Sequence, residues 1–289
     1  MSLTPEHLAT LAAAACAAPS ADNRHVFRLH AGSDQLVVVA DDTLAAGGAS
    51  RQVLGLLSIG AVTENLVLRG RQLGLALVPT WRAAAARGAD SAARVVLAVA
   101  GAPRQDTPLA AAIERRHTNR RLVFRGPRLS ATALQALAHE ADGLHGTAVR
   151  WLDARDDRPR ALRLIRRAET ERFRNPALHR ELFESIRFDV GWQATADEGL
   201  PPATLALPAL ERPAFALLRH WGVQRAANLL GAHWFVGWRG ADLPCRLAPH
   251  LGVVCAGGPV DEAAFQAGRL LQRLWLHATL LGLGFQVFA

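Results

Sequence analysis

Seven consecutive residues near the middle of the chain, Arg115 to Arg121, comprise four arginines, a histidine, a threonine and an asparagine. An arginine guanidinium carries a planar fork of N–H donors that matches two oxygens of a phosphate, and a nearby hydroxyl adds a further donor. The stretch follows an alanine- and leucine-rich segment (109–113) that is typical of a short helix. Two interpretations stay open for it, a phosphate-binding loop and a solvated turn between two helices.

Other chemistries lack a comparable pattern. The sequence has no Gly-x-Ser-x-Gly nucleophile elbow, no phosphate-binding P-loop and no paired-carboxylate or catalytic-triad signature. Gly282-Leu283-Gly284 follows a helical stretch and lacks a third glycine, so it is not a dinucleotide fingerprint. Four histidines stand outside any metal-ligand spacing and are expected in the core or on the surface: His220, His233, His250 and His277. We therefore expect no metal ion.

The charge balance argues little about partners. The 289 residues include 33 basic and 25 acidic side chains, a net charge of +8, and every basic residue is an arginine. Lysine and tyrosine are absent, which is the pattern that a GC-rich coding sequence leaves. The high isoelectric point is therefore weak evidence for nucleic-acid binding, and we expect a small-molecule ligand instead of a nucleic acid or a membrane.

Compartment signals favour the cytoplasm. The apolar segment from Leu8 to Ala18 follows Glu6 and His7 and no basic residue, so it is interpreted as a helix that starts at Thr4 and not as a signal peptide. No run of about 18 uncharged apolar residues predicts a membrane span. The cysteines form no Cys-x-x-Cys pair and predict no disulfide framework: Cys16, Cys245 and Cys255.

Hydrophobic periodicity and helix breakers predict a mixed α+β chain. Helices are expected at 4–17, 51–75, 130–140, 158–174, 176–188, 217–230 and 261–281. Strands are expected at 36–40, 76–81, 94–100, 149–152, 251–255 and 285–288.

Two of these helices repeat one pattern. Residues 60, 65, 66, 68, 73, 74 and 75 line up at identical spacing with 268, 273, 274, 276, 281, 282 and 283, and both copies end in Leu-Gly-Leu. Each helix follows a hydrophobic strand, so a duplicated α+β unit is the better account. The predicted halves are residues 1–108 and 109–289. Two such halves would pack their long helices together and form one core.

Two polar segments resemble motifs of a known family. Arg116-His117-Thr118-Asn119-Arg120 is similar to the Arg-His/Arg-Ser-x-Arg/Lys box of FMN-dependent nitroreductases. Pro19-Ser20-Ala21-Asp22-Asn23-Arg24-His25-Val26-Phe27 is similar to their Pro-Ser-x-x-Asn-x-Gln-Pro-Trp box. The order of the boxes resembles the fused, Acg-like members, in which one chain imitates the usual homodimer.

The resemblance implies a nitroreductase-like three-layer α/β/α fold with an intrachain pseudo-dimer, either monomeric or weakly dimeric. It implies FMN as cofactor and NAD(P)H as electron donor for the reduction of a small nitroaromatic, quinone or enone. Arg116, with Arg115 beside it, would meet the FMN phosphate, and Arg120 would lie near flavin N1, which is negatively charged in reduced flavin. The remaining implied cofactor contacts are His117, Thr118, Ser20, Asn23, Glu198 and Gly199.

Three departures from the family pattern matter. Gln-Pro-Trp is replaced by His25-Val26-Phe27, and the sequence ends at Ala289, where the family continues to further basic residues. The proline-rich segment 199–212 suits an ordered lid over the flavin. An alternative is therefore a non-catalytic FMN-binding or storage protein, and another is a protein that has lost flavin and binds a different ligand.

Overall fold

The structure is a computed structural model that describes residues 3–45, 48–84, 92–123, 126–152, 157–194 and 198–288. Its helices and two small sheets confirm a mixed α and β composition compatible with the α+β prediction. The chain forms two compact units, which are described separately. The first unit comprises 1–118, 131–150 and 254–285, and the second comprises 119–130, 151–253 and 286–289. The predicted halves, 1–108 and 109–289, were defined by a repeat in the sequence, whereas these units are defined by compactness. The halves therefore stay a prediction.

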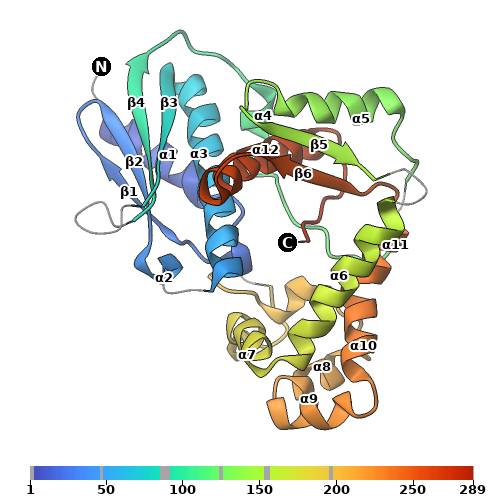
Figure 1. The fold of residues 1–289 in the computed structure, drawn as a ribbon. Coiled ribbons are helices and arrows are strands. Elements are labelled where there is room, and N and C mark those ends of the chain that lie inside the picture. The colour runs from blue at the N-terminus through green and yellow to red at the C-terminus, as the bar shows by residue number, and fades with distance from the viewer. Residues whose placement is uncertain are drawn as a thin grey trace. The chain divides into compact units, whose positions relative to one another are not determined.

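A four-stranded antiparallel sheet and its helices build the first unit (Figure 1). The sheet has the order β1-β2-β4-β3, from strands β1 (Phe27–Ala31), β2 (Gln35–Ala40), β3 (Leu75–Arg82) and β4 (Arg94–Gly101). The helices are α1 (Pro5–Cys16), α2 (Asp42–Ala45), α3 (Ala49–Leu73), α4 (Pro108–Ala111), α5 (Ala131–Ala138) and α12 (Val260–Leu280). Buried and less buried residues alternate along β2, which directs one face of the strand into the core.

Local signals set the ends of two of these helices. Thr4 caps α1, because its hydroxyl accepts a hydrogen bond from the His7 N–H at 3.2 Å. Gly74 ends α3 in the left-handed region, with φ +77°. Both ends were predicted. Among the described helices, α3 alone is long and apolar enough to cross a membrane, but 78% of that window is buried inside the structure, as in the core helix of a soluble protein.

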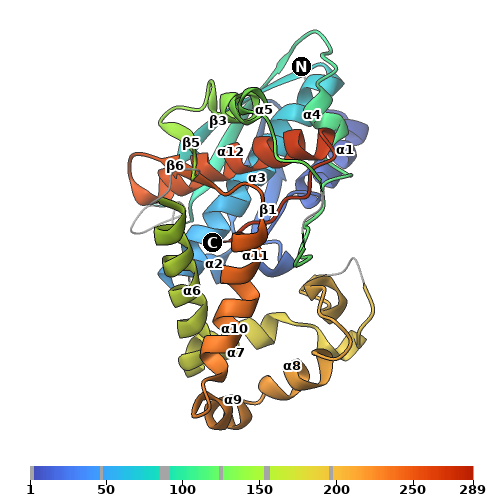
Figure 2. The same cartoon turned by 90° about the vertical axis from the view of Figure 1, so that its right-hand side faces the viewer.

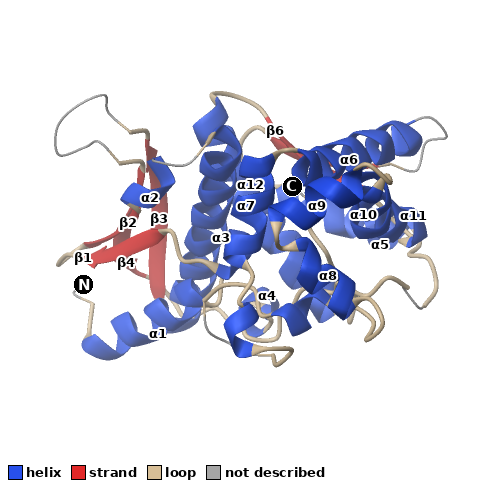
Figure 3. Cartoon of the chain, turned by 90° about the horizontal axis from the view of Figure 1, so that it is seen from below, coloured by secondary structure: helices blue, strands red, loops and turns tan. Residues whose placement is uncertain are grey.

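The two long helices cross at a pair of glycines. Helix α3 lies between the sheet and α12 when the unit is seen from below (Figure 3). A Cβ on Gly60 of α3 would lie 2.1 Å from the Phe265 carbonyl oxygen, and a Cβ on Gly268 of α12 would lie 2.0 Å from the Leu57 carbonyl oxygen. Each glycine therefore meets the residue three positions before the other glycine. The contact is reciprocal between the two glycines that match in the repeated pattern.

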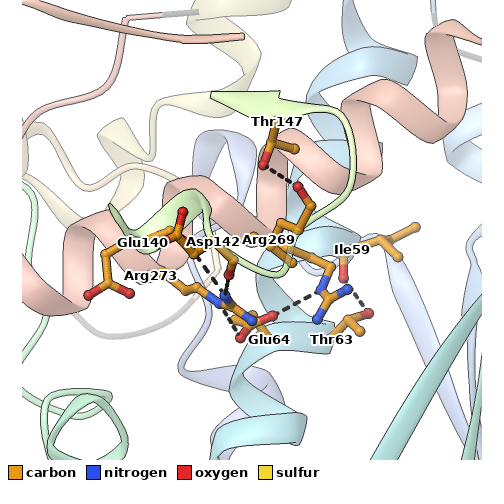
Figure 4. Close-up of polar contacts among 9 residues, drawn as sticks. Ile59, Thr63, Glu64, Glu140, Asp142, Thr147, Arg269 and Arg273 are labelled. Atoms are coloured by element: carbon orange, nitrogen blue, oxygen red, sulfur yellow. Dashed lines mark hydrogen bonds and ion pairs between the residues drawn. The ribbon is translucent and has the colours of Figure 1, made fainter. Parts of the chain in front are cut away.

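Polar contacts across this crossing follow the same reciprocity. Glu64 is fully buried and accepts hydrogen bonds from Nε of Arg269 at 2.9 Å and Nε of Arg273 at 2.7 Å (Figure 4). Gln272 donates to the Asn65 side chain at 2.6 Å. In the repeat, Glu64 corresponds to Gln272 and Asn65 to Arg273. Replacing each residue of the pair 64–273 by its counterpart in the other helix therefore gives the pair 65–272, which is also bonded.

Short helices make up most of the second unit. Strands β5 (Thr147–Trp151) and β6 (Gly252–Ala256) form a two-stranded sheet whose residues are divided between the two units. The helices of the second unit are α6 (Asp157–Arg174), α7 (Pro176–Ser185), α8 (Arg212–Leu218), α9 (Trp221–Asn228), α10 (Ala232–Gly237) and α11 (Leu243–Leu247). Helices α6 and α10 lie side by side in two perpendicular views (Figures 1 and 2). Gly237 permits this contact, because a Cβ there would lie 2.4 Å from the Thr170 hydroxyl oxygen.

Several predicted elements differ from the structure. The helix predicted at 217–230 is divided into α8 and α9, because the backbone of His220 is extended (ψ 114°). Helix α7 ends at Ser185 and not at 188, since Ile186 forms a parallel bridge with Leu200. The strand predicted at 285–288 is irregular chain without a partner strand. Helices α10 and α11 were not predicted, because their apolar periodicity is too short to stand out.

Candidate functional site

Arg116 links the two polar segments that the sequence singled out. One of its Nη atoms donates to the Ala17 carbonyl oxygen at 3.3 Å, three residues before Ser20. The residues around Ala17 and Arg116 therefore belong to one neighbourhood of the first unit, although these two residues are 99 positions apart in the chain. The helical turn after α4 produces this arrangement, since the Arg116 N–H bonds to the Ala112 carbonyl oxygen and the chain then leaves the helix.

The guanidinium of Arg116 has an unusual environment. Its Cζ lies 4.5 Å from the ring centroid of Trp275, and its Nε is buried without a hydrogen-bond partner. Burial lowers the pKa of Arg116 to about 10, so the side chain remains charged at neutral pH. No carboxylate pairs with Arg116 among the residues that the structure describes. A buried charge without a counter-charge is unfavourable, and an anion near Nε would relieve this cost.

Ser20 supplies a second unpartnered polar atom in this unit. Its Oγ is buried without a hydrogen-bond partner. The loop that follows is held on α3, because the Ala21 N–H donates to the Ser58 hydroxyl at 3.3 Å. Asp22 and Asn23 then both take positive φ values, +55° and +54°. Consecutive left-handed residues other than glycine are uncommon and strained, and such strain is often found in ligand-binding loops.

Three further predicted contacts of the first unit flank Arg116 in the chain. Arg115 and His117 are exposed, and Thr118 is partly buried. The imidazole Nδ1 of His117 lies 3.2 Å from the Arg115 carbonyl oxygen. The carbonyl of His117 accepts a hydrogen bond from Nε1 of Trp275 at 3.2 Å. The indole of Trp275 thus holds the loop backbone, while its ring faces the Arg116 guanidinium.

Trp275 is the residue that the sequence analysis missed. It is buried on α12, and it stacks on Phe285 with the ring centroids 5.1 Å apart. The repeat offered a signal for it, because the matching position in α3 is Val67. A tryptophan in place of valine within a repeated helix indicates that the second copy contacts something that the first does not.

Three predicted contacts lie in the second unit, where they form a different set of bonds. Nη1 of Arg120 donates to the Thr204 carbonyl oxygen at 3.4 Å, within the predicted lid 199–212. The Glu198 carbonyl oxygen accepts from Arg187 at 3.4 Å. Gly199 has φ +88°, and a Cβ there would lie 2.8 Å from the Arg187 side chain. Segment 199–212, which the sequence analysis interpreted as a lid, is thus held by a contact within the second unit, and the turn at 198–199 packs against the chain that follows α7.

Two of the histidines outside this site have structural partners. His277 pairs with Glu140 at 2.7 Å, and Nε2 of His250 accepts from the Leu129 N–H at 2.8 Å. Within the described ranges, no three histidine, cysteine, aspartate or glutamate side chains gather as a metal site would require.

Comparison with known proteins gives no further assignment. No protein-family model matches the chain, and no curated protein sequence matches it either. The case for a function therefore depends on the residues around Arg116.

Proposed function

We propose that this protein is an FMN-binding oxidoreductase of the nitroreductase type, which uses NAD(P)H to reduce a small nitroaromatic, quinone or enone. The observation that carries the proposal is the partly buried guanidinium of Arg116 close to the loop of Ser20. Its Nε is buried without a hydrogen-bond partner, and no carboxylate among the described residues pairs with it. The family resemblance names the anion that would pair with it, the phosphate of FMN.

The residues of the first unit suit such a group. Nε of Arg116 and its neighbouring Nη form a fork for two phosphate oxygens, and the Ser20 hydroxyl lacks a partner. Because Nε is enclosed, entry of an anion requires the guanidinium to move relative to the Trp275 ring. Arg115, His117, Thr118 and Asn23 belong to the same two loops and complete the proposed set.

The reciprocal helix crossing supports the finer fold proposal, a nitroreductase-like fold with two fused half-repeats. In a two-fold interface, residue i of one copy contacts residue j of the other, and j contacts i. The glycine contacts and the pairs 64–273 and 65–272 all obey this relation when the two helices are aligned so that Gly60 matches Gly268. A gene duplication that converted a homodimer into one chain would leave this pattern.

When bound, FMN would supply a ring that accepts and donates hydride, and the protein would supply binding and orientation. Arg116 would hold the phosphate, and the strained Asn23 loop would line the cofactor. We also propose Arg120 for the flavin N1 edge and the Glu198–Gly199 turn for the N5 edge. The hydrogen bond that Arg120 makes to the Thr204 carbonyl oxygen would have to exchange for one to the flavin.

The first test is the absorbance of the purified protein. We expect a flavin spectrum, either as purified or after addition of FMN, and bleaching by NADPH or NADH under argon. If nicotinamide does not bleach the bound flavin, the result would refute reductase activity. It would support the storage function instead, in which the lid excludes substrate. Protein that takes up no FMN would refute both.

The second test changes the phosphate contact. Arg116→Gln should raise the Kd for FMN tenfold or more, since each lost charged hydrogen bond contributes about 1.5–3 kcal/mol. Arg121→Gln is the matched control, because Arg121 is an exposed arginine of the same stretch that has no proposed role. Circular dichroism of both variants checks that the fold survives. Equal FMN affinity in the Arg116 variant and the control would contradict the phosphate role.

A further inference from the structure

A pocket in the second unit is lined by none of the residues assigned to FMN. Its volume is about 400 Å³, which falls in the range of small-molecule sites, roughly 300–1,000 Å³. One wall is a single face of α7, because its lining residues follow helical spacing: Pro176, His179, Arg180, Phe183 and Glu184. The opposite wall is formed by Phe188 and by the start of α9.

Aromatic rings form much of this lining. The rings of His179 and Phe183 have centroids 4.6 Å apart, and Phe183 stacks nearly parallel to Phe188 at 6.3 Å. His179 is buried and donates from Nε2 to the Leu218 carbonyl oxygen at 2.8 Å. Desolvation lowers the pKa of His179 despite that bond, so the ring is neutral at pH 7 and adds to the apolar lining. Such a lining favours a flat aromatic ligand.

The charges around the pocket favour an anion. The lining includes two guanidinium groups, on Arg180 and Arg219, and one carboxylate, on Glu184. The guanidinium of Arg219 lies 5.3 Å from the Phe188 ring centroid, and its Nε donates to Nε2 of His220 at 3.2 Å. These two contacts orient the guanidinium and leave its terminal N–H groups for a ligand. His220 also provides no side-chain cap for α9, whose positive end adds to the potential.

We propose that this pocket binds a small aromatic carboxylate, with its ring against the α7 face and its carboxylate on Arg219. The inference is independent of the proposed FMN site, because none of the lining residues is among those assigned to FMN. It assigns the protein a second small-molecule site, suited to a substrate or an effector of this class.

The test is calorimetric titration of the full-length protein with 2-naphthoate and with 2-naphthamide, which keeps the ring and removes the charge. We expect the acid to bind at least about tenfold more tightly than the amide, the effect of one charged hydrogen bond. Arg219→Gln should remove that preference by weakening naphthoate alone. Arg225→Gln, an exposed arginine of α9 outside the pocket lining, is the matched control and should change neither affinity.

Two further measurements fix the location. Naphthoate affinity should be unchanged in Arg116→Gln and in the presence of saturating FMN, so failure of FMN to bind would not affect this result. Equal affinities for acid and amide would overturn the proposal. The same holds if naphthoate gives no binding heat, or if Arg219→Gln, shown to be folded by circular dichroism, binds naphthoate like the wild type.

Discussion

The crossing of α3 and α12 gives the sharpest stability prediction, substitution of Gly60 by alanine. The new Cβ would lie 2.1 Å from the Phe265 carbonyl oxygen, whereas real Cβ contacts are essentially never under 3.0 Å. The two helices must therefore separate by about 1 Å, since the obstacle is backbone and no side-chain rotation removes it.

The expected magnitude follows from two opposing effects. Overpacking of a core costs about 1–3 kcal/mol, and a backbone collision belongs at the upper end. Alanine in place of glycine within a helix stabilises the helix by about 1 kcal/mol, because alanine has the higher helix propensity. We expect Gly60→Ala to lower the free energy of unfolding by about 2 kcal/mol, which corresponds to a melting temperature lower by about 4–8 °C. Gly268→Ala should behave alike, because its Cβ would lie 2.0 Å from the Leu57 carbonyl oxygen.

Thermal and urea denaturation of purified variants would measure these changes. Gly55→Ala is the matched control in the same helix, because its Cβ would meet the side chain of Leu44, which can rotate. It should cost less than Gly60→Ala. The double variant Gly60→Ala/Gly268→Ala should cost less than the sum of the single variants, because one separation of the helices relieves both collisions.

The reasoning fails if both single variants keep wild-type stability. Strict additivity in the double variant would contradict the reciprocal contact, even if each single variant is destabilised. If Gly55→Ala is as unstable as Gly60→Ala, then alanine destabilises α3 at either glycine. The collision with the Phe265 backbone would then not be the cause.

Three further predictions concern buried polar and aromatic groups. Glu64→Gln should lower the free energy of unfolding by about 3–5 kcal/mol in urea titrations, since it leaves two largely buried arginines without their carboxylate. His179 has a pKa below its unfolded value of about 6.5, so its contribution to stability is present above that pH and is lost as the pH falls below it. Melting curves of His179→Asn should therefore depend less on pH below about 6.5 than those of the wild type. Trp275→Phe retains a ring near Arg116 but loses the indole hydrogen bond to the loop, so it should increase hydrogen exchange at 115–119 while α12 stays protected.

Local signals in the sequence determined much of the secondary structure. The cap at Thr4, the stop at Gly74 and the apolar runs of β2 and β4 depend on neighbouring residues, so they could be recognised without a fold. The repeat also identified the two long helices and their shared glycine. Short elements such as α10 failed this approach, because a few residues carry too little periodicity.

For the site, the sequence supplied residue types but not their surroundings. The pattern Arg115 to Arg121 predicted an anion-binding loop or a solvated turn, and nothing local could decide between them. Only the tertiary structure places Trp275 against Arg116 and leaves Nε buried without a partner. Periodicity shows that a face is buried, but not what covers it, because the covering residue lies 159 positions away in the chain. The pocket between α7 and α9 could not be predicted for the same reason. Its lining residues come from separate parts of the chain and form a pocket only in the folded structure.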